Sequence, residues 1–309
     1  MKNLHAPPIG VVIVTYNAAD VILKCLESLM AAKPSVELHI FLIDNNSNDR
    51  TVSLIKRWAA GQHVAELSHN APFSLKKTQK PLLLRSSKEP GPGITLFEAE
   101  VNEGFAAGVN IGLSHLAGRK ELDRFWVLNP DCIVPPETPA ILASYPVPET
   151  GFALIGHRIL YLEPPHHIQS DGARVNLLTG VTGNLNLGKD RITTTPPPLD
   201  EINFISGASM VASREFYETA GPLPEEYFLY YEEVAWALKR GALPLVYCPD
   251  AVIYHQAGSS IGSPTVTKIA SPFSIYFMYR SRIIFMRRQR PLALPVTYGY
   301  AFAKAVQIA

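Results

Sequence analysis

An acidic residue follows a short apolar run near the middle of the chain, in a pattern that suits metal binding. The run 125–128 (FWVL) is followed by Asn129, Pro130 and Asp131. Such a run is typical of a strand buried on both faces, and strands of open α/β sheets present ligand-binding residues at their carboxyl ends. Pro130 biases the preceding residue towards an extended backbone, so the strand should end there and leave Asp131 to hold a cation that bridges phosphates. The alternative is an ordinary turn, since Asn-Pro and Pro-Asp are turn dipeptides.

Polar side chains also follow the first two apolar runs of the chain. The first run ends in Thr15, with Tyr16 and Asn17 next, and Asp44 follows the second run. The carboxyl ends of parallel strands meet at one edge of a sheet, where Asp44 is able to accept hydrogen bonds from a base N–H or from ribose hydroxyls. The pattern predicts a nucleoside site on this edge.

A third polar segment follows the next strand and enters a helix. It runs from Asn102 through Gly104 and Phe105 to Asn110 and is rich in small residues. Small residues at a helix entry let the backbone approach a ligand closely. The segment has no G-K-[ST] and is not a P-loop, and its spaced glycines alone are more typical of tight helix packing.

Two carboxylates and one histidine complete the set of candidate residues. Glu232 and Glu233 open a helix beside a cluster of aromatic residues. The helix macrodipole explains one acid in the first turn, so the other is a candidate general base. His255 follows a strand and either completes a metal site or forms a hydrogen bond in a loop.

The order of apolar segments predicts how these residues are positioned. Residues 1–135 alternate between strand and helix, which favours a mostly parallel, doubly wound α/β half. Residues 136–270 are expected to form the acceptor half. Within it, short apolar runs broken by prolines over 151–212 indicate antiparallel strands and hairpins, and a helix around 227–240 and strands near 244–248 and 250–255 are expected to follow. A basic, aromatic helix is expected near 272–290, within a separate C-terminal segment 271–309. The insert 62–93 is expected to be a surface loop, and no chemistry is assigned to it.

Composition excludes several classes of protein. The 309 residues include 28 Lys and Arg against 27 Asp and Glu, a net charge of +1, so no nucleic-acid partner is indicated. The three cysteines Cys25, Cys132 and Cys248 are far apart, which argues against a disulfide framework and favours a reducing cytosol. We expect neither a signal peptide nor a membrane-spanning helix.

Six segments, taken in order, resemble the family 2 inverting glycosyltransferases of the GT-A fold. They are VVIVTYN, LIDNNSND, NEGFAAGVNIG, VLNPD, the long stretch from ISGAS to LKRG, and HQAGSS. The resemblance covers about 9–290 and is strongest to the bacterial rhamnosyltransferase-like branch, in which Asn-Pro-Asp replaces Asp-x-Asp. It implies a Rossmann-like, mostly parallel central sheet, a smaller antiparallel sheet on the acceptor side and C-terminal helices.

The resemblance also assigns roles to individual residues. Nucleoside and donor contacts would come from Thr15, Tyr16, Asn17, Asp44, Asn102, Gly104, Phe105, Asn110 and Asn129. Asp131 would bind Mg²⁺ or Mn²⁺, with His255 as a further ligand. Glu233 would be the catalytic base, with Gly207 and Glu232 on the acceptor side.

Two positions depart from the family pattern. Glu233 stands where the family usually has Asp, and Ala235 replaces a later acid. A glutamate has the same chemistry with one more methylene, so base function is retained if the acceptor lies slightly farther away. The loss of the later acid affects which groups are available to bind the acceptor.

The resulting prediction is an inverting sugar transferase acting in polysaccharide biosynthesis at the cell envelope. The expected donor is a nucleotide sugar, with dTDP-rhamnose favoured, and the acceptor a glycan or a lipid-linked sugar. The basic, aromatic segment 273–290 predicts peripheral contact with the inner face of the cell membrane, against the alternative that it packs on the catalytic domain. A non-catalytic module that binds sugar nucleotides or glycans stays open as an alternative. An NAD-dependent dehydrogenase is disfavoured because the first strand–helix turn lacks G-x-G-x-x-G.

Overall fold

The computed structural model describes residues 6–32, 35–63, 73, 84–86, 93–256 and 270–308. The first half contains β1 (Ala6–Thr15), α1 (Ile22–Ala31), β2 (Val36–Asp44), α2 (Thr51–Ala59), β3 (Leu84–Ser86), β4 (Gly93–Glu98), α3 (Phe105–Ala117) and β5 (Arg124–Leu128). The second half contains β6 (Cys132–Ile133), α4 (Thr138–Ser144), β7 (Leu154–Tyr161), β8 (Ile168–Ser170), β9 (Ala173–Val175), β10 (Thr182–Asn184), β11 (Ser209–Ser213), α5 (Arg214–Ala220), α6 (Glu232–Ala237), β12 (Val246–His255), α7 (Pro272–Gln289) and α8 (Leu294–Ile308). Short 3₁₀ turns lie at Leu199–Glu201, Glu225–Tyr227 and Pro291–Ala293.

Ten of the described strands form one mixed sheet. Its order is β3-β4-β2-β1-β5-β11-β7-β12-β6, with β8 beside β7. The strands β3, β4, β2, β1 and β5 run parallel, whereas β11 is antiparallel to both of its neighbours. β9 and β10 form a small antiparallel sheet of their own. The predicted fold class is therefore confirmed.

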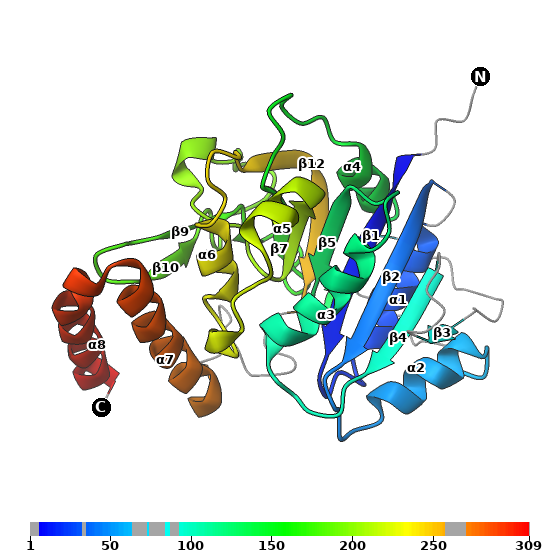
Figure 1. The fold of residues 1–309 in the computed structure, drawn as a ribbon, viewed down its shortest axis with the longest axis horizontal. Coiled ribbons are helices and arrows are strands. Elements are labelled where there is room, and N and C mark those ends of the chain that lie inside the picture. The colour runs from blue at the N-terminus through cyan, green and yellow to red at the C-terminus, as the bar shows by residue number, and fades with distance from the viewer. Residues whose placement is uncertain are drawn as a thin grey trace.

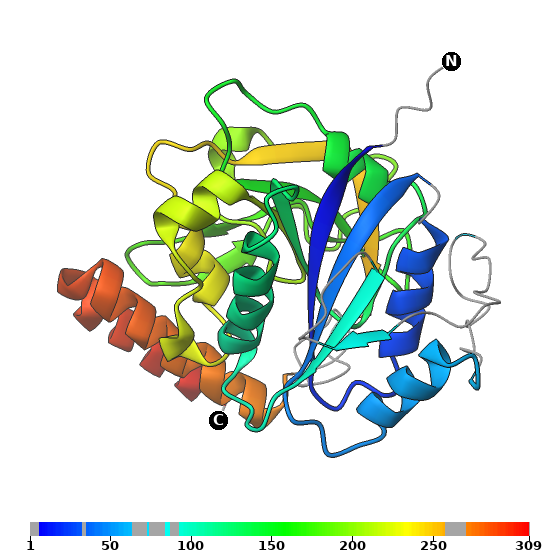
Figure 2. The same ribbon diagram turned by 45° about the vertical axis from the view of Figure 1, so that its right-hand side comes forward.

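The sheet is covered by helices on both faces (Figures 1 and 2). Alternate residues of β1 face opposite sides, because successive side chains of a strand point in opposite directions. Val11 and Ile13 belong to the apolar cluster under α1, α2 and α4, and Val12 and Val14 to the cluster under α3, α5 and α6. The near-continuous apolar sequence of β1 follows from this burial on both faces.

The C-terminal helices α7 and α8 lie side by side at one end of the molecule, far from β2 and β4 (Figure 1). Phe285 and Met286 of α7 are fully buried in the same apolar cluster as α3 and α6. α7 is therefore packed against the rest of the fold, and the division of the chain at residue 270 stays a prediction. Within the described residues, no helix is long and apolar enough to span a bilayer.

Three expected elements differ from those observed. The helix expected over 227–240 starts only at Glu232, because Phe228, Tyr230 and Tyr231 have positive φ angles that a helix excludes. The two strands expected over 244–255 form the single strand β12, with a register shift between Cys248 and Val252. The insert 62–93 contains the short strand β3, which pairs with β4, and most of its other residues lie outside the described part of the chain.

Candidate active site

The ends of β1 and β2 form the predicted nucleoside edge. Thr15 and Asp44 are partners in the β1–β2 pairing, and the Thr15 hydroxyl donates to Asp44 Oδ1 at 3.0 Å. Asp44 also accepts hydrogen bonds from the backbone N–H and the hydroxyl of Ser47, at 2.9 and 2.6 Å. These bonds hold the carboxylate in one orientation at the carboxyl edge of the sheet. Tyr16 and Asn17 are exposed beside it, so the edge can be reached from solvent.

The Asn102–Gly104 turn lies next to this edge. Asn45, the residue after β2, donates from its side chain to Asn102 Oδ1 at 3.3 Å and to the Gly104 carbonyl at 2.9 Å. Asn102 Oδ1 also accepts from the Gly104 N–H at 3.0 Å. The two predicted donor segments are therefore joined through Asn45, a residue that the sequence analysis did not select.

Gly104 has no room for a side chain. Its φ is +99°, and a Cβ there would lie 2.5 Å from the Phe228 carbonyl oxygen, which also accepts from the Phe105 N–H at 2.9 Å. The start of α3 therefore contacts the loop that precedes the two glutamates. Farther along α3, a Cβ on Gly108 or Gly112 would lie 2.8 or 2.6 Å from valine side chains of β1, so these two glycines serve helix packing.

Asn110 occupies a different environment from the other predicted donor residues. Its side-chain amide donates to the Leu223 carbonyl and to Glu225 Oε1, and its oxygen accepts from the Leu223 N–H. These bonds join α3 to the segment before α6. The structure explains Asn110 as a tie between two elements, and its predicted contact with the donor stays a prediction.

Asp131 and His255 are brought together although 124 positions separate them. Cys132, next to Asp131, pairs with His255 across β6 and β12, and His255 Nε2 lies 3.0 Å from Asp131 Oδ1. Asn129 Nδ2 lies 3.4 Å from the same imidazole nitrogen. The carboxylate and the imidazole both lie at the end of β5, where the sequence placed Asp131. His255 begins the segment HQAGSS, and the last four residues of that segment, 257–260, lie outside the described residues.

The chemistry of these side chains suits a divalent cation. Two ligands at right angles around a hard cation, each about 2.1 Å away, lie about 3.0 Å apart, which matches the observed separation of Nε2 and Oδ1. Cys132 is the third side chain of this cluster. Burial raises the pKa of its thiol well above the usual range, and the Asp131 carboxylate raises it further. Mg²⁺ and Mn²⁺ are hard cations that prefer oxygen and imidazole ligands to sulfur, so Asp131 and His255 are the fitting ligands.

The two glutamates at the start of α6 have different surroundings. Glu232 is 4% exposed, and its Oε2 is buried without a hydrogen-bond partner. Burial, and then the nearby Glu233, raise the pKa of Glu232 well above its usual range. Glu233 is only partly buried, and burial raises its pKa to about 7. Of the two carboxyls, Glu232 is therefore the more enclosed.

The segment Gly207–Ala208 lies between Asn129, at the end of β5, and Glu233, at the start of α6. The Ala208 carbonyl accepts from the Asn129 N–H at 2.9 Å. A Cβ on Gly207 would lie 3.7 Å from the Phe105 ring and 3.8 Å from Glu233 Cβ. This segment therefore lies next to Asn129, Phe105 and Glu233 together, and the roles assigned to these residues stay predictions.

Ala235 lies away from this arrangement. It is 3% exposed and packs in the apolar cluster beneath α6. Two residues along a helix turn by about 200°, so Ala235 and the partly exposed Glu233 face opposite sides. Position 235, where the family usually has an acid, is an apolar packing position in this protein. The alanine there therefore leaves the side of the helix that carries Glu233 unchanged.

Comparisons with known proteins bear on the family and the fold. The family model "Glycosyl transferase family 2" matches residues 10–72, which contain the nucleoside edge. The fold is GT-A. The mannosyltransferase PcManGT from Pyrobaculum calidifontis, solved with GDP-Man and Mn²⁺, is 15% identical with a TM-score of 0.50, covering 98% of this chain and 76% of that one. TarS residues 1–349 from S. aureus, solved with UDP-GlcNAc, is 16% identical with a TM-score of 0.52, covering 96% and 73%.

A curated relative is similar in sequence over part of the chain. The low-salt glycan biosynthesis hexosyltransferase Agl10 of Haloferax volcanii is 25% identical over 189 residues. The match covers 59% of this chain and 57% of Agl10, so it spans little more than half of either protein.

Proposed function

We propose that the chain is an inverting glycosyltransferase that moves a sugar from a nucleotide donor to an acceptor hydroxyl. The observation that carries the proposal is the Gly207–Ala208 segment, which accepts a hydrogen bond from Asn129 on one side and lies next to Glu233 on the other. Glu233 would take the proton of the acceptor hydroxyl as that oxygen attacks the anomeric carbon. A single base on the acceptor side suits attack in one step with inversion.

Asp131 and His255 would hold a divalent cation on the donor diphosphate, with Asn129 beside them. Such a cation supplies neutralisation of the charge that develops on the leaving nucleoside diphosphate. Mg²⁺ prefers oxygen ligands only, so a site with one imidazole and one carboxylate favours Mn²⁺. Thr15, Tyr16, Asn17 and Asp44 would hold the nucleoside, and Asn102, Gly104 and Phe105 would line the donor pocket. Gly207 and Glu232 would lie on the acceptor side.

For the donor we propose a dTDP-sugar, with dTDP-rhamnose first, because the chain has Asn129-Pro130-Asp131 where other members carry Asp-x-Asp. A glycan or a lipid-linked sugar would be the acceptor. A ligand that binds only the folded state raises the melting temperature, so a thermal-shift panel of dTDP-, UDP- and GDP-sugars with Mn²⁺ tests the donor. Stabilisation by UDP- or GDP-sugars but not by dTDP-sugars would contradict the dTDP assignment. Turnover of a bound donor would separate an enzyme from a non-catalytic binding module.

We further propose peripheral attachment to the inner face of the cell membrane through the C-terminal segment. Support comes from apolar side chains that are exposed beside cations. Leu292 is 97% exposed and Phe302 is 74% exposed, and Arg287, Arg290 and Lys304 lie exposed along the same helix pair. Apolar insertion and attraction to anionic headgroups act together at membrane surfaces. Attachment there would bring the site to a lipid-linked acceptor.

A further inference from the structure

We propose that Gln169 is a positioning residue that holds His255 in the state that binds the cation. The inference rests on the proposed function of Asp131 and His255. Gln169, on β8, places its Oε1 2.7 Å from His255 Nδ1. His255 Nε2, on the other side of the ring, lies 3.0 Å from Asp131 Oδ1. The imidazole is therefore held between the glutamine and the carboxylate.

The contact with Gln169 selects one tautomer of the neutral imidazole. An amide oxygen only accepts hydrogen bonds, so Nδ1 must carry the proton and donate it. In this tautomer Nε2 is free to bind the cation, whereas without a cation its 3.0 Å contact with Asp131 Oδ1 requires a proton on Nε2 as well. A histidine that binds metal through one nitrogen is usually oriented by a hydrogen bond from the other, and this also raises its basicity as a ligand.

A β-bulge directs Gln169 towards the histidine. In the pairing of β8 with β7, Ile168 lies opposite Leu160 and Ser170 lies opposite Ile159. Gln169 is thus the extra residue between two consecutive partners on β7. Ile168 and Ser170 are buried, whereas Gln169 is only partly buried. Bulges re-aim a side chain and are common next to active sites, and this one directs Gln169 across β7 to β12.

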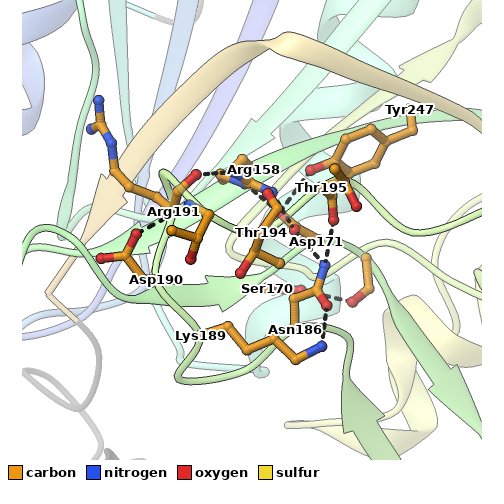
Figure 3. Close-up of polar contacts among 12 residues, drawn as sticks. Arg158, Ser170, Asp171, Asn186, Lys189, Asp190, Arg191, Thr194, Thr195 and Tyr247 are labelled. Carbon is orange, nitrogen blue, oxygen red and sulfur yellow. Dashed lines mark hydrogen bonds and ion pairs between the residues drawn. The ribbon is translucent and has the colours of Figure 1, made fainter.

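A buried ion pair fixes the strands that carry both residues (Figure 3). Asp171, two residues after Gln169, is fully buried and accepts two hydrogen bonds from Arg158 of β7, at 2.9 and 2.8 Å. Tyr247 of β12 donates to the same carboxylate at 2.7 Å, and Asn186 at 2.9 Å. Asp171 therefore joins β7, the end of β8 and β12 in one network.

A second contact secures β12 next to the histidine. Arg191 donates to the hydroxyl of Tyr254, the neighbour of His255, at 2.7 Å. The Arg191 carbonyl in turn accepts from Arg158 at 2.8 Å, so this segment belongs to the same network (Figure 3). The distance between Gln169 and His255 is thus set by rigid strands, which is what a positioning contact needs.

The test compares Gln169→Met with Gln169→Glu in the full chain. Methionine matches glutamine in length but accepts no strong hydrogen bond, whereas glutamate keeps the acceptor. We expect Q169M to weaken Mn²⁺ binding by about 10–100-fold and Q169E to bind at least as tightly as the wild type. Mn²⁺ affinity is measured by electron paramagnetic resonance without donor. Gln289→Met, at an exposed position of α7, is the matched control.

A nitrogen NMR spectrum of the imidazole adds a readout that simple packing would not change. The metal-free wild type should show a protonated Nδ1 on His255, and Q169M should lose that preference while keeping the wild-type melting temperature. Unchanged Mn²⁺ affinity in Q169M, with a wild type that binds Mn²⁺, would overturn the positioning role alone. A wild type that binds no Mn²⁺ would overturn the proposed metal site and, with it, the role of Gln169.

Discussion

Glu232 and Glu233 differ in burial, and this difference assigns their roles. Adjacent residues of a helix diverge by about 100°, so only one of the two can face an acceptor hydroxyl. Glu232 is almost fully enclosed, and this burial raises the pKa of its carboxyl well above the usual range. Glu233 is more exposed and lies beside Gly207. We therefore expect Glu233 to accept the proton.

The raised pKa of Glu233 predicts the pH dependence of turnover. A base works only when ionised, and burial raises the Glu233 pKa from the ordinary value to about 7. Turnover at saturating donor should therefore rise as the pH increases through about 7 and fall about tenfold per unit well below it. The same profile in Glu233→Gln should lack this limb. A wild-type rate that is flat between pH 5 and pH 8 would contradict the assignment.

Replacing the cation-binding carboxylate gives a second prediction at this scale. Asp131→Ala should abolish Mn²⁺-dependent donor binding, measured by calorimetry, because His255 alone cannot hold the cation on a diphosphate. His255→Ala should cause a smaller loss, of about 10–100-fold. Donor affinity that is equal in Asp131→Ala and the wild type would mean that Asp131 is a turn residue only.

At the level of elements, α7 holds the loop that leads into α6, where the proposed base Glu233 lies. Phe228, Tyr230 and Tyr231 all have positive φ angles, which cost free energy in residues with side chains. α7 offsets this cost through contacts with the loop. Two residues of α7 bind backbone carbonyls of the loop: Ser281 donates to Tyr227 and Leu229, and Arg280 donates to Glu226 and Tyr227. Two others bind tyrosine hydroxyls: Arg282 donates to Tyr231, and Ser274 contacts Tyr230. Arg280 and Arg282, which belong to the basic segment expected to contact a membrane, therefore have a structural role.

The contact between this loop and α3 can be tested at Gly104. Gly104→Ala would place a Cβ 2.5 Å from the Phe228 carbonyl, at a φ of +99°. We expect it to destabilise the protein by about 1–3 kcal/mol and to reduce turnover, since the displaced loop leads directly into α6, which carries Glu233. Gly183→Ala, whose Cβ would meet nothing within 4 Å, is the control. Equal denaturant midpoints and rates for both variants would contradict the account.

The sequence predicted the local part of these elements well. The apolar run of β5 followed by Asn129 and Pro130 placed Asp131 at a strand end, because strand termination there depends on neighbouring residues. No sequence pattern pointed to Gln169, because its position near His255 depends on the bulge in β8 and on the pairing of both β8 and β12 with β7. The late start of α6 was also missed, because the positive φ angles of non-glycine residues are imposed by tertiary contacts. Asn45 lay beside Asp44 in a polar turn, and only its contacts with Asn102 and Gly104 distinguish it.

At the scale of the whole molecule, strand order brings the site together. β1 lies between β2 and β5, so the ends of all three strands meet where the chain reverses its order across the sheet. The alternating pattern of the first 135 residues predicted a mostly parallel, doubly wound half but not this strand order. The continuation of the sheet through β11, β7 and β12 was not predicted in detail, because antiparallel pairing over long separations leaves no local pattern. That continuation supplies His255 and Gln169.

Membrane attachment is a prediction about the outer surface of the C-terminal helices. The double substitution Leu292→Glu and Phe302→Glu should reduce co-sedimentation with anionic vesicles by removing apolar surface from the interface and adding negative charge. Turnover on a water-soluble acceptor should be kept, because neither side chain contacts the loop before α6. Ile192→Glu, at another exposed apolar position, is the control. Equal vesicle binding by the wild type and the double variant would contradict attachment through this surface.

These substitutions are preferable to removing the segment. A chain ending at Pro272 would also lose the contacts of Ser274, Arg280 and Ser281 with the loop before α6. Its loss of activity would then report on the loop as well as on membrane binding.

The most direct test of the central claim is the release of nucleoside diphosphate by the wild type and by Glu233→Gln. Both proteins are given the donor that stabilises the wild type most, with Mn²⁺ and an acceptor sugar. We predict Mn²⁺-dependent release by the wild type, a rate about 10²–10⁴-fold lower in Glu233→Gln, and the same donor affinity in both. Equal rates in the two proteins, or the absence of any donor that the wild type turns over, would contradict the account.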